Sequence, residues 1–354
     1  MERILVINPG ATSTKFAVFD GETAILKQTV EHHGDELKQF GRVYDQFPYR
    51  LQLIRGALAA AAIDINTLKA VVGRGGLLKP LNGGTYAVNA QMVDDMKQAE
   101  RGEHASNLGP VISYYLAREL SIPAFIVDPV SVDELVPEAR ISGMPDLDRV
   151  SLSHALNMKA VARKAAADMG RSYKDVNFVV VHLGTGVSVS AHQGGKMIDV
   201  NNSKDEGPFS PDRCGGLPAS QLVELCFSGK YTLPELKQRL FGSGGFYAYL
   251  GTKDLRQIEK MVEEGHDKAA LLFKAFAYQV AKEIGALTAT LAGKVDRIVI
   301  TGGMAYSQRL VDAIAQWVQF IAPIVTIPGE EELEALAAGA LRVLRGEEQP
   351  QLYQ

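Results

Sequence analysis

The sequence contains little cysteine, no block of basic residues and no long apolar run. Its two cysteines, Cys214 and Cys226, cannot build a disulfide framework or a zinc site alone, so we assign them no chemistry and expect a reducing compartment. A formal net charge of −4, without a basic block, excludes an extended positive surface for nucleic acid. No apolar run approaches the ~20 residues that span a bilayer, and the N-terminal residues lack the layout of a signal peptide. We therefore expect a cytoplasmic protein that binds neither nucleic acid nor membrane.

The chain is long enough and apolar enough to form two domains of ordinary size. It has 354 residues, of which 46% are hydrophobic and 22% are charged. This composition is typical of a globular protein with large buried cores, and the length predicts two domains. We place an N-terminal lobe at residues 1–150 and a C-terminal lobe at residues 151–354, with the last helix as a candidate to pack back on the N-terminal lobe.

Two segments share the order strand, glycine-bearing turn, strand. Residues 4–20 read ILVINPGATSTKFAVFD, and residues 178–192 read FVVVHLGTGVSVSAH. Gly10 and Gly184 occupy equivalent places, 174 residues apart, which is about half the chain. The match favours an internal duplication, although so short a match also arises by chance. The alternation after the first turn predicts a strand, which excludes a Walker loop because that motif leads into a helix.

The rest of the sequence alternates between strand and helix patterns. Strands are predicted at the apolar runs KAVVG, IPAFIVDP, DRIVITGGM and PIVTIPG, and IDVNN extends the second sheet. Helices are predicted over residues 43–62, 91–98, 110–120, 153–168, 218–226, 267–291, 307–320 and 332–344. This alternation predicts an α/β fold in which helices cover the sheets.

Three turns with glycine and hydroxyl side chains each follow an apolar strand. They read NPGATST, HLGTGVS and TGGMAYS. Glycine lets backbone N–H groups come close to an anion, and hydroxyls add hydrogen-bond donors. One such turn is usually only a hairpin turn. Three of them at strand ends, where α/β proteins gather ligands, predict a nucleotide phosphate chain held between the two lobes.

These turns and three further motifs resemble the acetate kinase family, within the acetate and sugar kinase, Hsp70 and actin superfamily. The opening is similar to the family's N-[SA]-G-S-S-S-x-K, HLGTGVS to H-L-G-N-G-[AS]-S and VITGGM to F-T-G-G-[IV]. SPDRCGG resembles T-R-x-G, KDLRQIE resembles S-D-x-R-[DE], and IPGEEEL resembles the N-E-E segment. The six matches occur in family order and run through nearly the whole chain. The resemblance implies a two-lobed, duplicated actin-like and ribonuclease H-like ATPase fold, with mixed sheets flanked by helices.

Differences from the usual motif sequences of acetate kinases favour the family's butyrate kinase branch. Acetate kinases typically read H-R-V-V-H-G-G where this chain reads VVGRGGLL, F-D-T-A-F-H where it reads IVDPVSV, and F-H-G-T-S-H where it reads LSHALNM. The segments NPGATSTK, VVGRGG and EHASNLG resemble butyrate kinases. The branch implies reversible, in-line transfer of a phosphoryl group from ATP to butanoate, which gives butanoyl phosphate and ADP, with Mg²⁺ as cofactor.

The resemblance also implies catalytic roles. A carboxylate is ionised at neutral pH and needs no general base, so the demand is for fixed cations and a divalent metal. Arg74 would hold the substrate carboxylate, and Arg213 would stabilise the transferring phosphoryl group. His154 would donate to the phosphoryl oxygens, and Asp128 would orient an arginine or a magnesium-bound water. The structural alternatives are a surface arginine in a Gly-rich turn, a histidine at a helix start and an aspartate that caps a turn.

The nucleotide and metal residues follow from the same motifs. The predicted nucleotide contacts are Ser13, Lys15, His182, Gly184, Thr185, Gly186, Asp254, Arg256, Gly302 and Gly303. Asn8 and Glu331 would hold Mg²⁺, directly or through water, although the alignment of GEEEL with N-E-E-L can slip to Glu330 or Glu332. Acidic residues also stabilise a helix N-terminus without any metal.

Several alternatives stay open. Acetate, propionate and branched acids differ from butanoate by methylenes, and one methylene gives only ~1–3 kcal/mol of discrimination. A sugar or polyol kinase of the same superfamily would need an aspartate base, for which Asp128 is the candidate. An Hsp70- or actin-like ATPase is disfavoured because the sequence carries no extended peptide-binding domain, and an inactive relative is disfavoured by Arg74 and Arg213. The family implies a homo-oligomer, either a dimer or a larger assembly.

Overall fold

The computed structural model describes residues 2–354 and divides them into two compact units. Unit 1 combines the residues before Glu134 with the C-terminal segment Glu331–Gln354, and unit 2 is Glu134–Glu330. The chain therefore leaves unit 1 once and returns to it for its last helix.

The division differs from the predicted boundary between residues 150 and 151. Residues 134–150 belong to unit 2, because Arg149 forms ion pairs with Asp199 and Glu206 at 3.1 and 3.0 Å. These charged contacts carry no apolar pattern that would mark the boundary in the sequence.

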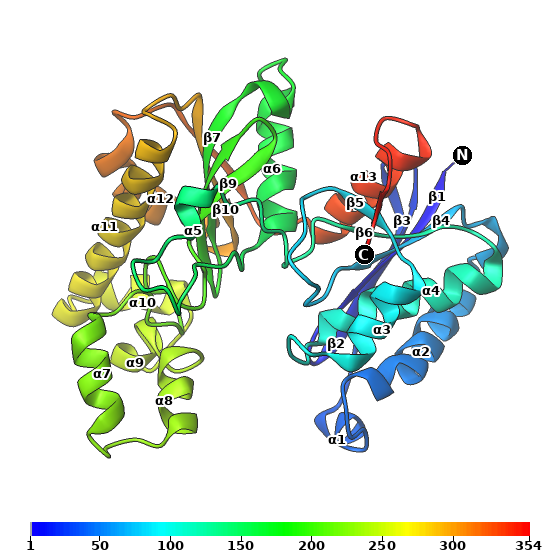
Figure 1. The fold of residues 1–354 in the computed structure, drawn as a ribbon, viewed down its shortest axis with the longest axis horizontal. Coiled ribbons are helices and arrows are strands. Elements are labelled where there is room, and N and C mark those ends of the chain that lie inside the picture. The colour runs from blue at the N-terminus through cyan, green and yellow to red at the C-terminus, as the bar shows by residue number, and fades with distance from the viewer. Residues whose placement is uncertain (1) are drawn as a thin grey trace. The chain divides into compact units, whose positions relative to one another are not determined.

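Seven strands form the sheet of unit 1, in the order β12-β5-β6-β4-β1-β2-β3. The strands are β1 Arg3–Pro9, β2 Ser13–Asp20, β3 Thr23–Glu31, β4 Ala70–Arg74, β5 Thr85–Ala87, β6 Ala124–Val127 and β12 Gln351–Leu352. The helices are α1 Gly34–Lys38, α2 Phe47–Ala60, α3 Ala90–Gln98, α4 Leu108–Leu120 and α13 Glu332–Leu344. Helix α4 covers one face of β1, β4 and β6, and α13 covers the other (Figure 1).

Glycines allow both helices to approach the strands very closely. A Cβ at Gly73 in β4 would overlap the backbone of Gly109 in α4, and a Cβ at Gly109 would overlap the carbonyl of Arg74. On the other face, a Cβ at Gly339 in α13 would overlap the side chain of Val127. Glycine is required at such contacts because it alone has no side chain. The packing fixes the end of β4, and with it the position of Arg74.

Five strands form the sheet of unit 2, in the order β11-β10-β7-β8-β9. The strands are β7 Asn177–Leu183, β8 Val187–Gln193, β9 Lys196–Val200, β10 Arg297–Gly302 and β11 Ile324–Pro328. The helices are α5 Pro137–Arg140, α6 Ala155–Ala167, α7 Ala219–Phe227, α8 Leu233–Leu240, α9 Gly245–Leu250, α10 Leu255–Glu263, α11 Asp267–Thr290 and α12 Gln308–Val318. Helix α6 lies on one side of this sheet, and α11 and α12 lie on the other (Figure 1).

The two sheets repeat one arrangement of strands. The order β6-β4-β1-β2-β3 in unit 1 corresponds to β11-β10-β7-β8-β9 in unit 2. In each, an antiparallel hairpin continues into a third antiparallel strand, and the first strand of the hairpin pairs in parallel on its other side. The hairpins pair Asn8 with Lys15 and His182 with Ser188. The predicted pair of strand–turn–strand segments is therefore confirmed, and the repeat covers five of the seven strands in unit 1 and all five in unit 2.

Most predicted elements are present with small shifts. Helix α13 has its predicted bounds, whereas α2 begins at Phe47 because Tyr44–Gln46 form a 3₁₀ turn. The helices and strands that were not predicted are β3, β5, β12, α1, α5, α8, α9 and α10. Strand β3 lies at the sheet edge with mostly exposed or half-buried side chains, so it lacks the apolar alternation that identifies a strand.

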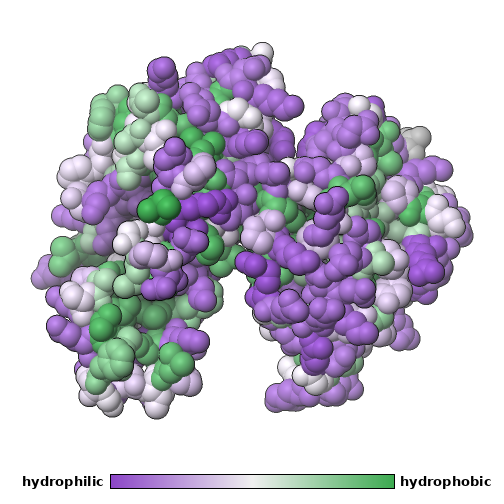
Figure 2. Space-filling model, viewed as in Figure 1, coloured by the Kyte–Doolittle hydropathy of each residue, from purple (hydrophilic) through white to green (hydrophobic). Residues whose placement is uncertain are grey.

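Two properties of the helices concern the predicted partners: α7 and α8 expose apolar side chains, and no described helix could span a membrane. Helix α7 has no buried residue, and Val223, Phe227 and the nearby Leu233 of α8 are exposed. Figure 2 shows apolar side chains gathered over this part of unit 2. Within residues 2–354, every helix is too short or too polar to cross a membrane.

We predict that His32 makes unit 1 sensitive to acid. Burial, together with the positive charge of Arg50, lowers the pKa of His32 to about 4, well below the ~6.5 of a free histidine. Between these values the unfolded chain binds a proton that the folded chain excludes, so stability falls as the pH falls from 6.5 and is unaffected above it. Urea unfolding at pH 7.5 and 5.0 should show a smaller loss for His32→Gln than for the wild type. The exposed neighbour His33, changed to Gln, serves as the control, and equal losses in all three proteins would contradict the prediction.

Candidate active site

The turn between β1 and β2 is the first predicted phosphate-binding segment. Gly10 donates its backbone N–H to the carbonyl of Ser13 at 2.7 Å, which closes the turn. Ser13 is half-buried at the start of β2, and Lys15 is exposed on the same strand, opposite Asn8. Arg50 of α2, which no motif indicates, donates to the Gly10 carbonyl at 2.8 Å. The turn is thus held by a buried side chain from a helix.

Asn8, Arg74 and Glu332 form a polar cluster at the ends of β1 and β4 in unit 1. The two Nη atoms of Arg74 lie 3.0 and 3.3 Å from the two carboxylate oxygens of Glu332. The side-chain amide of Asn8 donates to the same carboxylate at 2.6 Å and accepts from Arg74 at 3.3 Å. Arg74 is therefore placed to hold a carboxylate in the two-point geometry that guanidinium favours.

The carboxylate that reaches Asn8 belongs to Glu332 and not to Glu331, the first choice for the metal site. Glu331 is exposed and precedes α13, whereas Glu332 is the first residue of that helix and is half-buried. Glu330 lies in unit 2, with its carboxylate 3.1 Å from Nε2 of His182. Whether Glu330, Glu331 or Glu332 serves the metal stays a prediction, and the contact with Asn8 favours Glu332.

Asp128 occupies an unusual backbone conformation directly after β6. Its φ is 38°, and the residue is 1% exposed. Its carboxylate accepts the N–H of Gly84 at 2.7 Å, and its own N–H donates to the Gly84 carbonyl at 3.0 Å. Positive φ is uncommon outside glycine, and such residues cluster at functional sites. The structure thus places Asp128 in a fixed position where β6 ends, bonded to the loop before β5.

The two predicted histidines lie together in unit 2. The rings of His154 and His182 stack with their centroids 3.9 Å apart and their planes within 9° of parallel. Nδ1 of His154 lies 3.0 Å from the Ser188 hydroxyl, and Nδ1 of His182 lies 2.9 Å from Oδ1 of Asn157. Because a carbonyl oxygen only accepts, Nδ1 of His182 carries a proton. The partners hold both rings in place from Nδ1.

The Gly184–Gly186 turn between β7 and β8 lies against the guanidinium of Arg213. A Cβ at Gly186 would overlap that guanidinium, so glycine allows the close approach. Arg213 donates to the carbonyl and hydroxyl of Ser203 at 2.9 and 3.0 Å, and its buried Nε, 3.9 Å from Asp212, makes no hydrogen bond in the described chain. Burial lowers the pKa of Arg213, and Asp212 opposes that shift. A half-buried guanidinium with an unused donor beside a glycine turn is suited to an anion such as phosphate.

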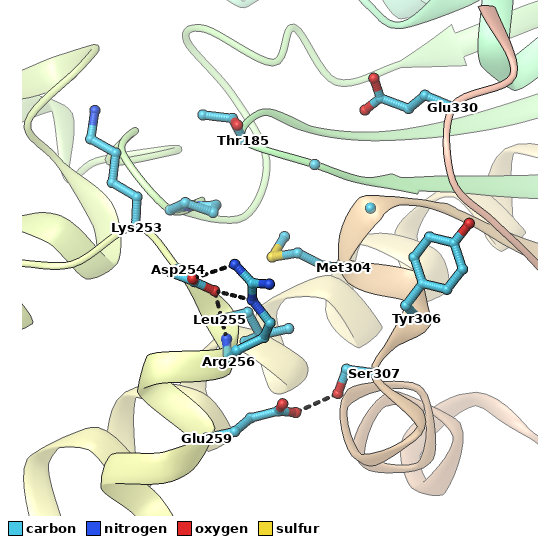
Figure 3. Close-up of a pocket in the computed structure, with 13 residues that line it drawn as sticks. Thr185, Lys253, Asp254, Leu255, Arg256, Glu259, Met304, Tyr306, Ser307 and Glu330 are labelled. Carbon is cyan, nitrogen blue, oxygen red and sulfur yellow. Dashed lines mark hydrogen bonds and ion pairs between the residues drawn. The ribbon is translucent and has the colours of Figure 1, made fainter.

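A cavity of about 600 Å³ opens beside this turn in unit 2. Met304 lines it, together with five residues of the predicted nucleotide set, which are Gly184, Thr185, Asp254, Arg256 and Gly303. Figure 3 shows Asp254 and Arg256 joined on one side of the cavity, with Met304 extending toward them from the other. The volume is typical of a small-molecule site. An apolar side chain, a paired arginine and a glycine turn fit the three parts of a nucleotide, which are base, ribose and phosphate.

The third predicted turn shapes one wall of the cavity. Gly302 has a φ of 91°, and a Cβ there would overlap the carbonyl of Leu183 at the end of β7. Gly303 has open space around its missing side chain. On the same wall the hydroxyl of Ser307 donates to the carboxylate of Glu259, a pair that no motif predicted (Figure 3).

Mg²⁺ is suited by the donor types in unit 1. The Asn8 amide oxygen and the Glu332 carboxylate are hard oxygen ligands of the kind that Mg²⁺ takes in small number beside phosphates and waters. Among residues 2–354, no three His, Cys, Asp or Glu side chains gather into a complete protein metal site. The chain therefore offers a partial site of the kind that a metal shared with a nucleotide uses.

Comparisons with known proteins support this interpretation. Residues 151–322 match the model of the acetokinase family. The crystal structure of Porphyromonas gingivalis acetate kinase superposes with a TM-score of 0.82 at 17% identity, over 97% of this chain and 100% of that chain. Entamoeba histolytica acetate kinase gives 0.77 at 17% identity, over 96% and 98%. A propionate kinase from Francisella tularensis gives 0.72 at 18% identity, over 95% and 98%.

The predicted fold is thereby confirmed. At these identities the likeness establishes the actin-like ATPase fold, in which two helix-flanked mixed sheets repeat one topology. The residues that match the family model include both histidines, the glycine turn, Arg213 and all the residues that line the cavity except Glu330. The butyrate kinase branch stays a prediction.

We predict that Arg74 and Glu332 are energetically coupled. Their ion pair is largely shielded from solvent and shares Asn8 as a third partner, so removal of either side chain leaves polar groups unmatched. A double-mutant cycle with Arg74→Met and Glu332→Met, followed by urea unfolding, should give a coupling energy of about 1 kcal/mol or more. The same cycle with Glu331→Met in place of Glu332→Met is the control. Additive effects in the Arg74–Glu332 cycle would show that the contact is not formed in solution.

Proposed function

We propose that this chain, whose residues 151–322 match the acetokinase family model, transfers a phosphoryl group between ATP and a short-chain carboxylate, with butanoate as the preferred acid. The observation that carries the proposal is the family match over a segment that holds the glycine turn, Arg213 and a nucleotide-sized cavity. Arg74, which already holds a carboxylate within unit 1, supports an acidic substrate.

The reaction needs charge neutralisation more than acid–base chemistry. A carboxylate oxygen attacks the γ-phosphorus of ATP, the bond from that phosphorus to the bridging oxygen breaks, and ADP leaves with the electron pair. No proton has to move, because the acid is ionised before it reacts. In this scheme Arg74 orients the carboxylate, and Arg213 balances charge on the transferring group. His154 donates to phosphoryl oxygens, His182 lies stacked on it at the phosphate turn, and the reverse reaction uses the same groups.

The nucleotide lies in the cavity of unit 2 in this proposal. Gly184, Thr185 and Gly186 contact its phosphates, Asp254 and Arg256 lie at its ribose, and Gly302 and Gly303 with Met304 bound the base. Ser13 and Lys15 are the groups that unit 1 offers to phosphate in this proposal. Mg²⁺, held by Asn8 and Glu332, would neutralise phosphate charge and align the reacting oxygens.

Two neighbouring functions remain alternatives. Acetate, propionate or a branched acid would use the same groups. The acetate kinases and the propionate kinase among the structural relatives support acetate and propionate as alternatives to butanoate. A sugar or polyol kinase would need Asp128 as a base, yet the carboxylate of Asp128 already accepts the Gly84 N–H. We also propose a homo-oligomer, since the exposed apolar side chains of α7 and α8 form a surface suited to self-association.

The proposed function predicts acyl phosphate formation. With Mg·ATP and a series from acetate to hexanoate plus isobutyrate, trapping with hydroxylamine should give a hydroxamate, with kcat/KM highest for butanoate. Acetate should be about tenfold or more lower, as expected for the loss of two methylenes from a fitted pocket. A maximum at acetate or propionate would keep the carboxylate kinase and overturn the butanoate preference. If no acid gives hydroxamate, the carboxylate kinase is wrong, and ADP release with sugars and polyols tests the other kinase.

The metal assignment predicts that Glu332, and not Glu331, sets the magnesium requirement. Glu332→Gln keeps an oxygen but removes the charge beside Asn8, so the Mg²⁺ concentration for half-maximal activity should rise about tenfold or more. Glu331→Gln, a matched change one residue earlier on an exposed side chain, should leave that concentration nearly unchanged. A magnesium titration of both variants checks this, and the opposite pattern would restore Glu331 as the metal residue.

A further inference from the structure

Arg50 is a buried cation whose role the reaction scheme leaves open. It lies in α2 and is 1% exposed. Nη1 donates to the carbonyls of Gly10 and Ser13 at 2.8 and 3.2 Å, and Nη2 donates to the carbonyl of Ala11 at 3.4 Å. Three carbonyls of the β1–β2 turn therefore converge on one guanidinium.

The remaining partners of Arg50 are neutral as well. Nη1 also donates to the Thr14 hydroxyl at 3.0 Å, and Nε and Nη2 donate to Oε1 of Gln46 at 3.2 and 2.8 Å. Within residues 2–354, no carboxylate is bonded to Arg50. Burial lowers its pKa to about 10, so the side chain stays protonated at neutral pH. An unbalanced positive charge thus lies directly beneath the turn.

The direction of the carbonyls fixes the direction of two amides. All described peptide bonds are trans, so each C=O points opposite to the N–H of the next residue. Because the carbonyls of Gly10 and Ala11 point to Arg50, the N–H groups of Ala11 and Thr12 point away from it. Both residues are exposed, and neither amide has an acceptor in the described chain. The turn presents two free donors on its outer side.

Burying the positive charge of Arg50 costs folding free energy unless a bound group interacts with that charge. Taking an ion out of water costs free energy, and apolar replacements of buried charges are often neutral or stabilising. The hydrogen bonds of Arg50 offset part of that cost, but a neutral residue could close the same hairpin. Paired outward amides with a positive charge behind them are, in contrast, what a bound anion requires.

We propose that Arg50 is a positioning residue that shapes and charges the β1–β2 turn for the terminal phosphate of the nucleotide or for the phosphoryl group of the acyl phosphate. The inference rests on the proposed kinase function. Arg50 touches no substrate in this scheme. It acts through the amides of Ala11 and Thr12, which bind the phosphoryl oxygens.

The test compares Arg50→Met and Arg50→Lys with the wild type. Arg50→Met removes the guanidinium donors and the charge. Because charge-assisted contacts are lost, we expect the KM for Mg·ATP to rise about tenfold or more. The KM for the carboxylate should change little. Arg50→Lys keeps the charge but reaches fewer carbonyls, so its KM for Mg·ATP should lie between those of the wild type and Arg50→Met. Arg55→Met, on the same helix and paired with Glu119 at the surface, is the matched control. A role in folding alone would lower the unfolding temperature of Arg50→Met without separating the two KM values.

Calorimetric titration with Mg·ATP separates this proposal from the proposed function. A weaker Kd in folded Arg50→Met than in the wild type supports the role of Arg50, even if no acid is phosphorylated and the kinase proposal fails. Acyl phosphate formation with unchanged Kd and KM in the variant overturns the role of Arg50 and leaves the kinase standing. A wild type that binds no Mg·ATP overturns both. If Arg50→Met does not fold, unchanged constants in Arg50→Lys overturn the role.

Discussion

The polar cluster of unit 1 depends on the contacts that the Glu332 carboxylate makes. It comes from the first turn of the last helix, yet it bonds Asn8 at the end of the first strand and Arg74 at the end of β4. Helix α13 reaches this position because it packs across β1, β4 and β6, where Gly339 lets it come close. The C-terminal segment therefore does not extend unit 2. It completes the cluster that we propose holds both the metal and the substrate acid.

The other two proposed anion sites share one arrangement. In each, a cationic side chain lies close to the backbone of a tight or glycine-containing turn. Arg213 lies against the Gly184–Gly186 turn, and Arg50 lies beneath the β1–β2 turn. Fixed cations and oriented amides of this kind suit the meeting of two anions, because they neutralise charge without needing to reorganise. The protein contributes position and charge, and the reaction itself moves no proton.

Much of this was predictable, and the gaps have physical causes. The repeated hairpins, helix α13 and the glycine turns carry strong local patterns, and the structure confirms them. The choice between Glu331 and Glu332 depended on the register in which GEEEL is aligned with N-E-E-L, and three successive glutamates leave that register open. Arg50 was missed because its main partners are backbone carbonyls of a turn 37–40 residues earlier in the chain, and a carbonyl leaves no trace in residue identity. The edge strand β3 was missed for its mixed exposure.

The most direct test of direct phosphoryl transfer follows the oxygen atoms. The enzyme would be given Mg·ATP and butanoate with ¹⁸O in both carboxylate positions, and ³¹P NMR would record the products. The account predicts an acyl phosphate resonance, formed in step with ADP, that carries the isotope shift of one bridging ¹⁸O. ADP accompanied only by unshifted inorganic phosphate would contradict it, because the phosphoryl group would then have gone to water.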